Sequence, residues 1–471
     1  MRQTIAFSLA LLALAPAALA EGELLAGWAS VDITPSRPVA LAGQMHTRVS
    51  RSVHDPVTAT VLAIEKGPEQ AILVSCDMVS IHGPFLEALR KRISKEIPGF
   101  DASRLLLNAT HTHTAPVMRD LYEIPSGVMT PSEYVAFAID RLAPAISAAW
   151  NARKPAGVSW GLGQAVVGHN RRVVYQDGTA RMYGKTATPD FRRFEGYEDH
   201  GVDLLFLWDA ANRLTGVMIN LACPSQVVEG QSYISADFWH DVRKQLRAKH
   251  GEGLFVFAMT SAAGDQSPHV LYRKRAEERL RERLGLSETE ELASRIVGAV
   301  ETVFPAAAKD IRRDVPFAHR VTELKLPARR VSQAEADAAR SEYARLANTP
   351  ATDRSRHVFL QRHRNVIDRY ERQGSDPQYD MRLHVLRLGD IAIAANPFEL
   401  FLDYGVQMKA RSKAEQTFVV QLAGDGTYLP TKEALAGGHY GTEAASCLVG
   451  PEGGQMLVER TLQVIDSIWS K

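Results

Sequence analysis

Short apolar segments typical of buried β-strands alternate with amphipathic helical segments along almost the whole chain. Segments 56–65 and 71–77 are rich in β-branched residues and flank a Lys-Gly-Pro turn, a pattern that predicts a hairpin. Helical periodicity follows at 83–96. Strands and helices continue to alternate, with no internal repeat and no long linker. The pattern predicts an α/β fold, with one large domain built on a mixed β-sheet with surrounding helices.

Two later helical regions have distinctive sequence patterns, one a helix-capping motif and the other a high content of charged residues. Segment 271–303 is helical but interrupted, and it restarts at Ser287 with Glu290 three residues on, as a capping box requires. Segment 331–373 contains two charged helices without a strong apolar stripe. We interpret 331–373 as a charged helical insertion on the surface, of a kind that can form a lid.

The first 20 residues have the pattern of a secretory signal peptide. A basic start precedes an apolar run at 5–18, and an Ala-Leu-Ala sequence ends at Ala20. We therefore expect cleavage near Ala20, with export of a mature chain 21–471 to the periplasm or beyond. No later run reaches about 18 apolar residues, so we expect no transmembrane segment in the mature chain.

The net charge bears on nucleic-acid binding, and the cysteine count bears on disulfide pairing. The 471-residue chain has a formal net charge of +1, which argues against a nucleic-acid partner bound by bulk electrostatics. Three cysteines are present, at positions 76, 223 and 447. Because three is an odd number, at least one thiol has no partner within the chain.

Polar residues collect where predicted strands end. The clusters are Asp77; His111 with His113; 223–226; 264–269; 396–399; and 427–428. A buried sheet tolerates polar strand ends only where they are used or solvated. Ligands of α/β proteins also bind at strand ends. These clusters therefore predict one catalytic cleft.

The segment 105–116 is the most informative of these strand ends. Its apolar start predicts a buried strand, and the polar turn that follows carries His111 and His113. Alternate residues of an extended chain point to the same side, so both rings can face one cleft. Imidazole is a common metal ligand and the usual acid or base near neutral pH. The alternative is a polar loop with two solvated histidines.

Six motifs give the chain a resemblance to a known family. They are GWASVDITP at 27–35, NATHTHTAP at 108–116, GHNR at 168–171, GDQSP at 264–268, NPFE at 396–399 and TYLPT at 427–431. The same order is found in the neutral ceramidases, zinc-dependent hydrolases that cleave the amide bond of N-acylsphingosine. The resemblance spans residues 25–471 and implies a neutral-ceramidase-like catalytic domain, one Zn²⁺ per chain and a small-molecule or lipid-like substrate.

The resemblance also implies roles for individual residues. The implied zinc ligands are His111, Glu399 and Tyr428. The implied catalytic residues are His113, Ser267, Asp265, Arg171 and Tyr440. Among these, His113 stands beside the metal, Ser267 belongs to the active-site turn, and Arg171 and Tyr440 hold the polar head of the substrate.

The chain departs from the family pattern at the second histidine ligand. Segment 222–226 takes that position and contains no histidine. Cys223 can supply a thiolate, which binds zinc well. His240, at the start of the following helix, is the competing candidate. We favour His240 because a loop cysteine is often only a buried apolar residue. The sequence also ends at Lys471, without the C-terminal immunoglobulin-like domain of full-length members. Both departures imply a divergent member of the family, for which a ceramide substrate does not follow from the resemblance.

These observations predict an exported zinc-dependent hydrolase that cleaves a ceramide-like N-acyl amide with metal-activated water. Arg171 or Tyr440 would stabilise the oxyanion, and His113 would transfer a proton to the leaving amine. One alternative is a related zinc hydrolase acting on a non-ceramide amide, an ester or a glycoconjugate. A second is a non-catalytic exported binding protein.

Overall fold

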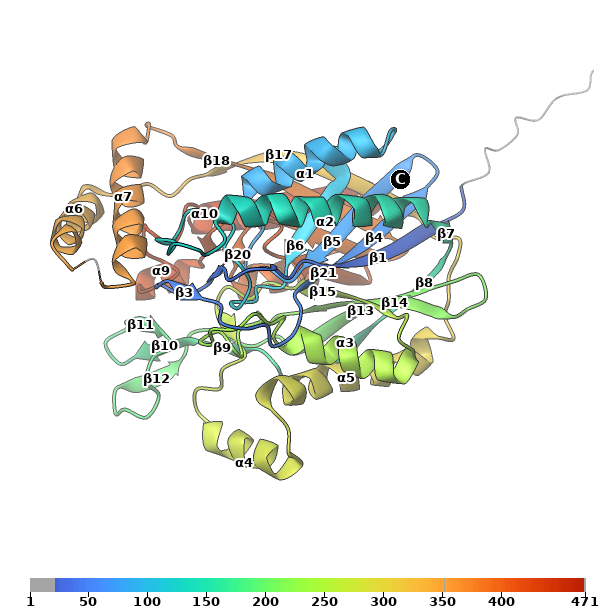
Figure 1. Cartoon of the computed structure of the whole chain (residues 1–471), viewed down its shortest axis with the longest axis horizontal. Coiled ribbons are helices and arrows are strands. Elements are labelled where there is room, and N and C mark those ends of the chain that lie inside the picture. The colour runs from blue at the N-terminus through green and yellow to red at the C-terminus, as the bar shows by residue number, and fades with distance from the viewer. Residues whose placement is uncertain (1–21, 351, 470–471) are drawn as a thin grey trace, which may run out of the picture.

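The computed structural model describes residues 22–350 and 352–469, and the predicted signal peptide lies outside them. The α/β class is confirmed, but the strands are divided among several sheets rather than one (Figure 1). Strongly twisted open sheets rarely grow beyond about ten strands before they split, which explains the difference. Within the described residues, every helix is too short or too polar to cross a lipid bilayer.

The first sheet is mixed and has the strand order β6-β5-β4-β1-β7. Its strands are β1 Leu25–Asp32, β4 Thr58–Lys66, β5 Glu69–Cys76, β6 Leu105–Ala109 and β7 Lys154–Pro155. The predicted hairpin is confirmed, since β4 and β5 pair antiparallel, whereas β5 and β6 are parallel. The helices α1 Gly83–Glu96 and α2 Pro131–Asn151 cover one face of this sheet (Figure 1).

The second sheet has the order β15-β14-β13-β8. Its strands are β8 Gly157–Gln164, β13 Gly201–Trp208, β14 Leu214–Leu221 and β15 Phe255–Thr260. Helices α3 Phe238–His250 and α5 Glu288–Ala307 pack on it, while α4 Lys274–Leu284 projects from the body (Figure 1). The predicted capping box at the start of α5 is confirmed, because the Ser287 and Glu290 side chains exchange hydrogen bonds with each other's backbone.

The third sheet has the order β17-β18-β19-β21. Its strands are β17 Phe317–Pro327, β18 Gln378–Leu388, β19 Ile391–Ala395 and β21 Gln416–Val420. Helices α8 Leu402–Arg411 and α10 Pro451–Trp469 cover its outer face. The inner faces of all three sheets contribute to one central apolar core, which includes Leu73, Phe257 and Ile393. Strand ends from different sheets are therefore brought close together.

Shorter elements occupy the region where these strands end. They are β2 Ala40–Leu41, β3 Arg48–Val49, β9 His169–Asn170, β10 Arg172–Tyr175, β11 Ala180–Met182, β12 Phe191–Phe194, β16 Gln266–Ser267, β20 Glu399–Leu400, β22 Tyr428–Leu429 and α9 Lys432–Gly437. The short 3-10 helix η1 Ala102–Arg104 instead leads into the start of β6, at the other end of that strand. The pair β9–β16 joins the GHNR and GDQSP motifs, and the pair β20–β22 joins NPFE to TYLPT. Motifs far apart in sequence are thus adjacent in the fold.

The segment 331–373 forms two helices, α6 Gln333–Ala347 and α7 Arg356–Arg372, that pack against each other. Val331, which precedes this pair, and the buried side chains at 336 and 366 within it form one apolar cluster with Ala444. Val358 of α7 instead packs with Ala40 and Val117. The insertion therefore bridges two segments that border the strand ends.

Candidate active site

His111 and His113 follow β6 in a tight turn. The turn is not the extended chain expected from the sequence, because His111 has a left-handed backbone with φ of 65°. Such a conformation costs about 1–3 kcal/mol and is often found at functional sites. The two rings still lie on one side, with 3.2 Å between their Nε2 atoms. Gly43 packs against His113 so closely that an added Cβ would lie 2.3 Å from the ring.

Glu399 and Tyr428 are direct neighbours on the parallel pair β20–β22. This register places their side chains on the same side, close enough for the Tyr428 hydroxyl to act on the pKa of the Glu399 carboxyl group. Glu399 Oε2 lies 3.6 Å from His111 Nε2. The structure therefore brings together the three residues expected to bind a metal, from two different sheets.

Hydrogen bonds assign the proton positions on the two histidines. His111 Nδ1 lies 2.6 Å from the carbonyl oxygen of Val79, so it carries the proton and Nε2 presents a lone pair. Gln226 Oε1 accepts from Arg171, so its Nε2 donates to His113 Nε2 at 2.8 Å. No donor among the described residues is then left for His111 Nε2, which faces a carboxylate.

This donor set fits a divalent cation. A neutral imidazole nitrogen, a carboxylate and a phenol oxygen, from His111, Glu399 and Tyr428, are all groups that bind zinc, and three protein ligands leave a position open. The fit depends on Tyr428. Within the described residues, no three side chains of histidine, cysteine, aspartate or glutamate form a metal-binding group.

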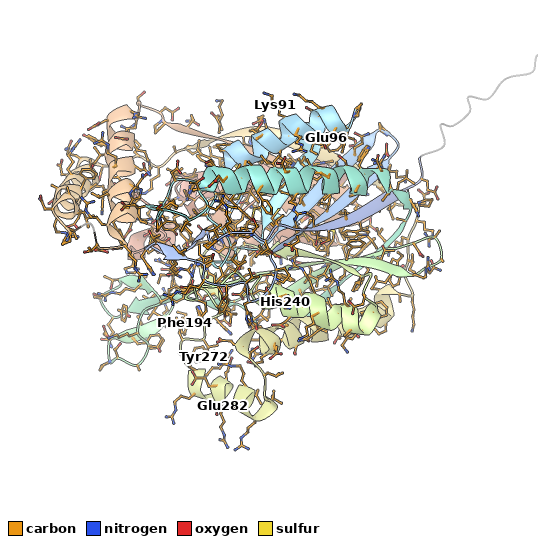
Figure 2. All side chains as sticks on the ribbon, viewed as in Figure 1. Lys91, Glu96, Phe194, His240, Tyr272 and Glu282 are labelled. Atoms are coloured by element: carbon orange, nitrogen blue, oxygen red, sulfur yellow. The ribbon has the colours of Figure 1, made fainter. Side chains whose placement is uncertain are left out.

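Neither candidate for the missing ligand contacts these three residues in the described part of the chain. His240 lies in the first turn of α3, where its side chain is 39% exposed and Nδ1 is 3.9 Å from Asp55 (Figure 2). Cys223 is fully buried in the core of the second sheet, and its Sγ donates to the carbonyl oxygen of Val167. Burial raises the pKa of the Cys223 thiol well above its usual value, which disfavours the thiolate.

Arg171 lies between β9 and β10 and supplies the buried positive charge of the site. Its guanidinium donates to the carbonyl oxygen of Gly264 at 2.9 Å and to the hydroxyls of Tyr183 at 2.9 Å and Tyr428 at 3.3 Å. The Tyr183 hydroxyl in turn lies 3.2 Å from Ser267 Oγ. Ser267 therefore joins the site through Tyr183, from a fully buried position.

Tyr440 and Asp265 have different positions. The Tyr440 ring packs edge-on against Tyr428, with 5.4 Å between the ring centroids. Asp265 instead accepts hydrogen bonds from the Leu402 backbone at 2.8 Å and from the Asn170 amide at 3.1 Å. Asp265 thus anchors the start of α8 and strand β9 beneath the site.

A carboxylate that sequence reasoning missed holds His113. Glu229 Oε2 lies 3.0 Å from His113 Nδ1, and Glu229 Oε1 lies 3.2 Å from His269 Nε2. Glu229 and Tyr183 come from irregular segments without a period or motif. For Gln226 the sequence contained one indication of a role in the site, because the residue belongs to the polar cluster that follows β14.

Burial and neighbouring charges set the protonation of this cluster. Burial, and then the proximity of His113, lowers the pKa of His111 well below its usual value, so the ring is neutral. Burial raises the pKa of Glu399, against the effects of Tyr428 and Arg171. Burial acts to raise the pKa of Glu229 as well, but hydrogen bonds from His113 and His269 outweigh it and lower that pKa. A bound cation would favour the anionic forms of Glu399 and Tyr428.

Two solved structures share this fold. The neutral ceramidase from Pseudomonas aeruginosa superposes with a TM-score of 0.69 at 16% identity, over 95% of this chain and 75% of that one. A structure described as a ceramidase complexed with C2 gives a TM-score of 0.67 at 14% identity, over 95% and 76%. No protein-family model and no curated protein sequence matches the chain. The predicted neutral-ceramidase-like fold is confirmed.

Proposed function

We propose that this protein is a zinc-dependent hydrolase that cleaves a ceramide-like N-acyl amide bond. The proposal rests mainly on the proximity of His111, Glu399 and Tyr428. His111 Nε2 lies 3.6 Å from Glu399 Oε2. The shared fold with two ceramidases supports the same reaction class. Export by a signal peptide is also part of the proposal and rests on the sequence of residues 1–20 alone.

In this proposal His111, Glu399 and Tyr428 would hold the zinc ion. When bound, zinc supplies a Lewis acid that polarises a carbonyl oxygen and lowers the pKa of water. The lone pair on His111 Nε2 is the group that makes this binding possible, because the bond from Nδ1 to Val79 fixes the tautomer.

The remaining residues of the site bind the substrate and move a proton. Arg171 is a buried donor adjacent to Tyr428 and is placed to stabilise an oxyanion. His113 Nε2 accepts a hydrogen bond from Gln226 and is the atom able to take a proton and deliver it to the leaving amine. Ser267 and Tyr440 are expected to position the amide and its polar head. This arrangement requires no acyl-serine.

The test of the proposed function uses the purified mature protein. We expect about one zinc ion per chain by mass spectrometry and release of free amine from an N-acyl amide by the zinc-loaded protein. Matched esters and glycosides are measured beside the amide, because they distinguish the related-hydrolase alternative. A protein that binds no zinc when supplied with it, and cleaves none of these compounds, would instead be a binding protein.

Replacing Glu229 with glutamine is expected to reduce kcat about 10- to 100-fold while leaving the zinc content unchanged. The change removes the charge that holds His113 Nδ1 at 3.0 Å but keeps the size of the side chain, and losing such a partner has this order of effect. Steady-state kinetics and zinc analysis of Glu229→Gln measure it. Unchanged kcat would show that His113 does not depend on Glu229.

A further inference from the structure

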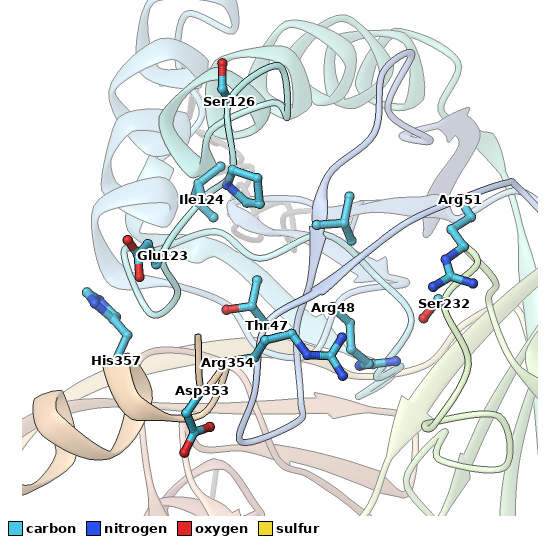
Figure 3. A pocket seen from close by; sticks show the side chains of 12 residues that line it. Thr47, Arg48, Arg51, Glu123, Ile124, Ser126, Ser232, Asp353, Arg354 and His357 are labelled. Carbon is cyan, nitrogen blue, oxygen red and sulfur yellow. The ribbon is translucent and has the colours of Figure 1, made fainter. Parts of the chain in front are cut away.

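An arginine-lined cavity of about 750 Å³ lies between the segment around β3 and the start of α7 (Figure 3). Four parts of the chain form its walls: the segment around β3, the loop at 123–126, Ser232, and residues 353–357 at the start of α7. Its charged lining residues are Arg48, Arg51, Arg354, Glu123 and Asp353, and His357 adds an imidazole. Arginine side chains therefore enter one cavity from segments some 300 positions apart in sequence (Figure 3).

Arg48 gives the cavity a buried positive charge, which the nearby Glu229 carboxylate offsets only in part. The residue is only 4% exposed. Its guanidinium donates to three backbone carbonyl oxygens, those of Ala42 at 2.7 Å, His113 at 2.5 Å and Gln231. Its Nε has no hydrogen-bond partner within the described residues. Because carbonyl groups are neutral, they orient this cation without cancelling its charge.

Arg51 and Arg354 are exposed, and their side chains make no hydrogen bond or ion pair with another residue of 22–350 or 352–469. The carboxylates nearby are fewer than the arginines. Asp353 accepts hydrogen bonds from the backbone and hydroxyl of Ser355, which hold the carboxylate in its anionic form. Asp353 and Glu123 are the two anionic groups of the lining, against the three arginines Arg48, Arg51 and Arg354. The cavity thus offers guanidinium groups suited to carboxylate or phosphate oxygens.

The cavity and the candidate active site share a wall. Arg48 lines the cavity and donates to the backbone carbonyl of His113, whose ring lies at the site. A ligand held there would therefore have a charged end beside the residue that is expected to move the proton.

We propose that this cavity binds an anionic group, a carboxylate or phosphate, on the N-acyl substrate itself. The inference rests on the proposed function and deepens it. It makes the substrate class an acidic N-acyl amide rather than neutral ceramide.

The experiment compares N-lauroylglycine with N-lauroylethanolamine, which differ by a carboxylate in place of a hydroxymethyl group. We expect zinc-loaded wild type to favour the glycine compound in kcat/KM. The double variant Arg51→Gln/Arg354→Gln should lower kcat/KM for this compound by about tenfold or more, because charged hydrogen bonds are lost, and should leave the ethanolamine compound unchanged. Arg279→Gln, an exposed arginine on α4, is the matched control and should change neither value.

Unchanged kcat/KM for N-lauroylglycine in the double variant would overturn the proposal. If wild type cleaves neither amide, the proposed function fails. Calorimetric binding of N-lauroylglycine then tests separately whether the cavity binds an anion. Binding about tenfold weaker in the double variant would still support an anion site, and equal binding would exclude it.

Inorganic phosphate at constant ionic strength should inhibit cleavage of the glycine compound alone. Equal changes in the cleavage of both amides would show a free phosphate effector and overturn the substrate assignment.

Discussion

Replacing His111 with alanine is expected to remove both the bound zinc and the amide hydrolysis. His111 Nε2 is the only nitrogen of the proposed ligand set, and without it Glu399 and Tyr428 provide two oxygens. Losing metal activation costs several kcal/mol of transition-state stabilisation, which corresponds to a fall in kcat/KM of about a thousandfold or more. Mass spectrometry of the metal content and steady-state kinetics on an N-acyl amide measure the two effects.

Two matched variants decide between the ligand candidates considered from the sequence. His240→Ala and Cys223→Ser should keep their zinc, because His240 lies partly exposed on α3 and Cys223 is buried against Val167. Loss of zinc in either would show that the residue reaches the metal in the loaded protein. A His111→Ala protein with normal zinc content and turnover would refute the proposed metal site.

Replacing Asp77 with alanine is expected to lower the free energy of unfolding by about 3–5 kcal/mol, since it leaves the buried Arg243 guanidinium without its counter-charge. Asp77 is fully buried and accepts from both terminal nitrogens of Arg243, at 2.7 and 2.9 Å. It also accepts from the backbone N–H of Thr58 at 2.8 Å, so it joins α3 to the first sheet. Urea denaturation measures the loss.

A double replacement and an exposed ion pair serve as controls. Asp77→Leu with Arg243→Met should recover much of the lost stability, because both charges are removed from the interior together. Glu459→Ala should leave the urea midpoint nearly unchanged, since its bidentate pair with Arg411 is about half exposed to solvent. If Asp77→Ala had as little effect as Glu459→Ala, the buried pair would not stabilise the fold.

The sequence predicted local structure well where a strong period or a turn signal was present. Helix 83–96 and the restart at Ser287 agree with the structure, as does the hairpin around Gly67, which has φ of 55°. The strands at 169–194 were not predicted. They have two to four residues each, which is too short to show a period.

The candidate site was partly predictable, because several of its residues follow strands that the sequence pattern indicates. His111, Glu399 and Tyr428 each lie where a predicted strand ends or beside it, and the fold brings those strand ends together. Glu229 and Tyr183 escaped prediction because irregular segments carry them. The cavity was not predictable either, since it needs Arg48 and Arg354 from opposite parts of the chain.

The sequence by itself determined the α/β class, the main helices and the polar residues at strand ends, because these depend on periodicity and on residues close in the chain. Only the tertiary structure decided which polar residues meet. Helix α3 illustrates the difference. Burial of Trp239 and Val242 against the second sheet sets the rotation of the helix and leaves His240 partly exposed. Which side of a helix faces a sheet is decided by long-range packing, and that choice separates a metal ligand from a surface histidine.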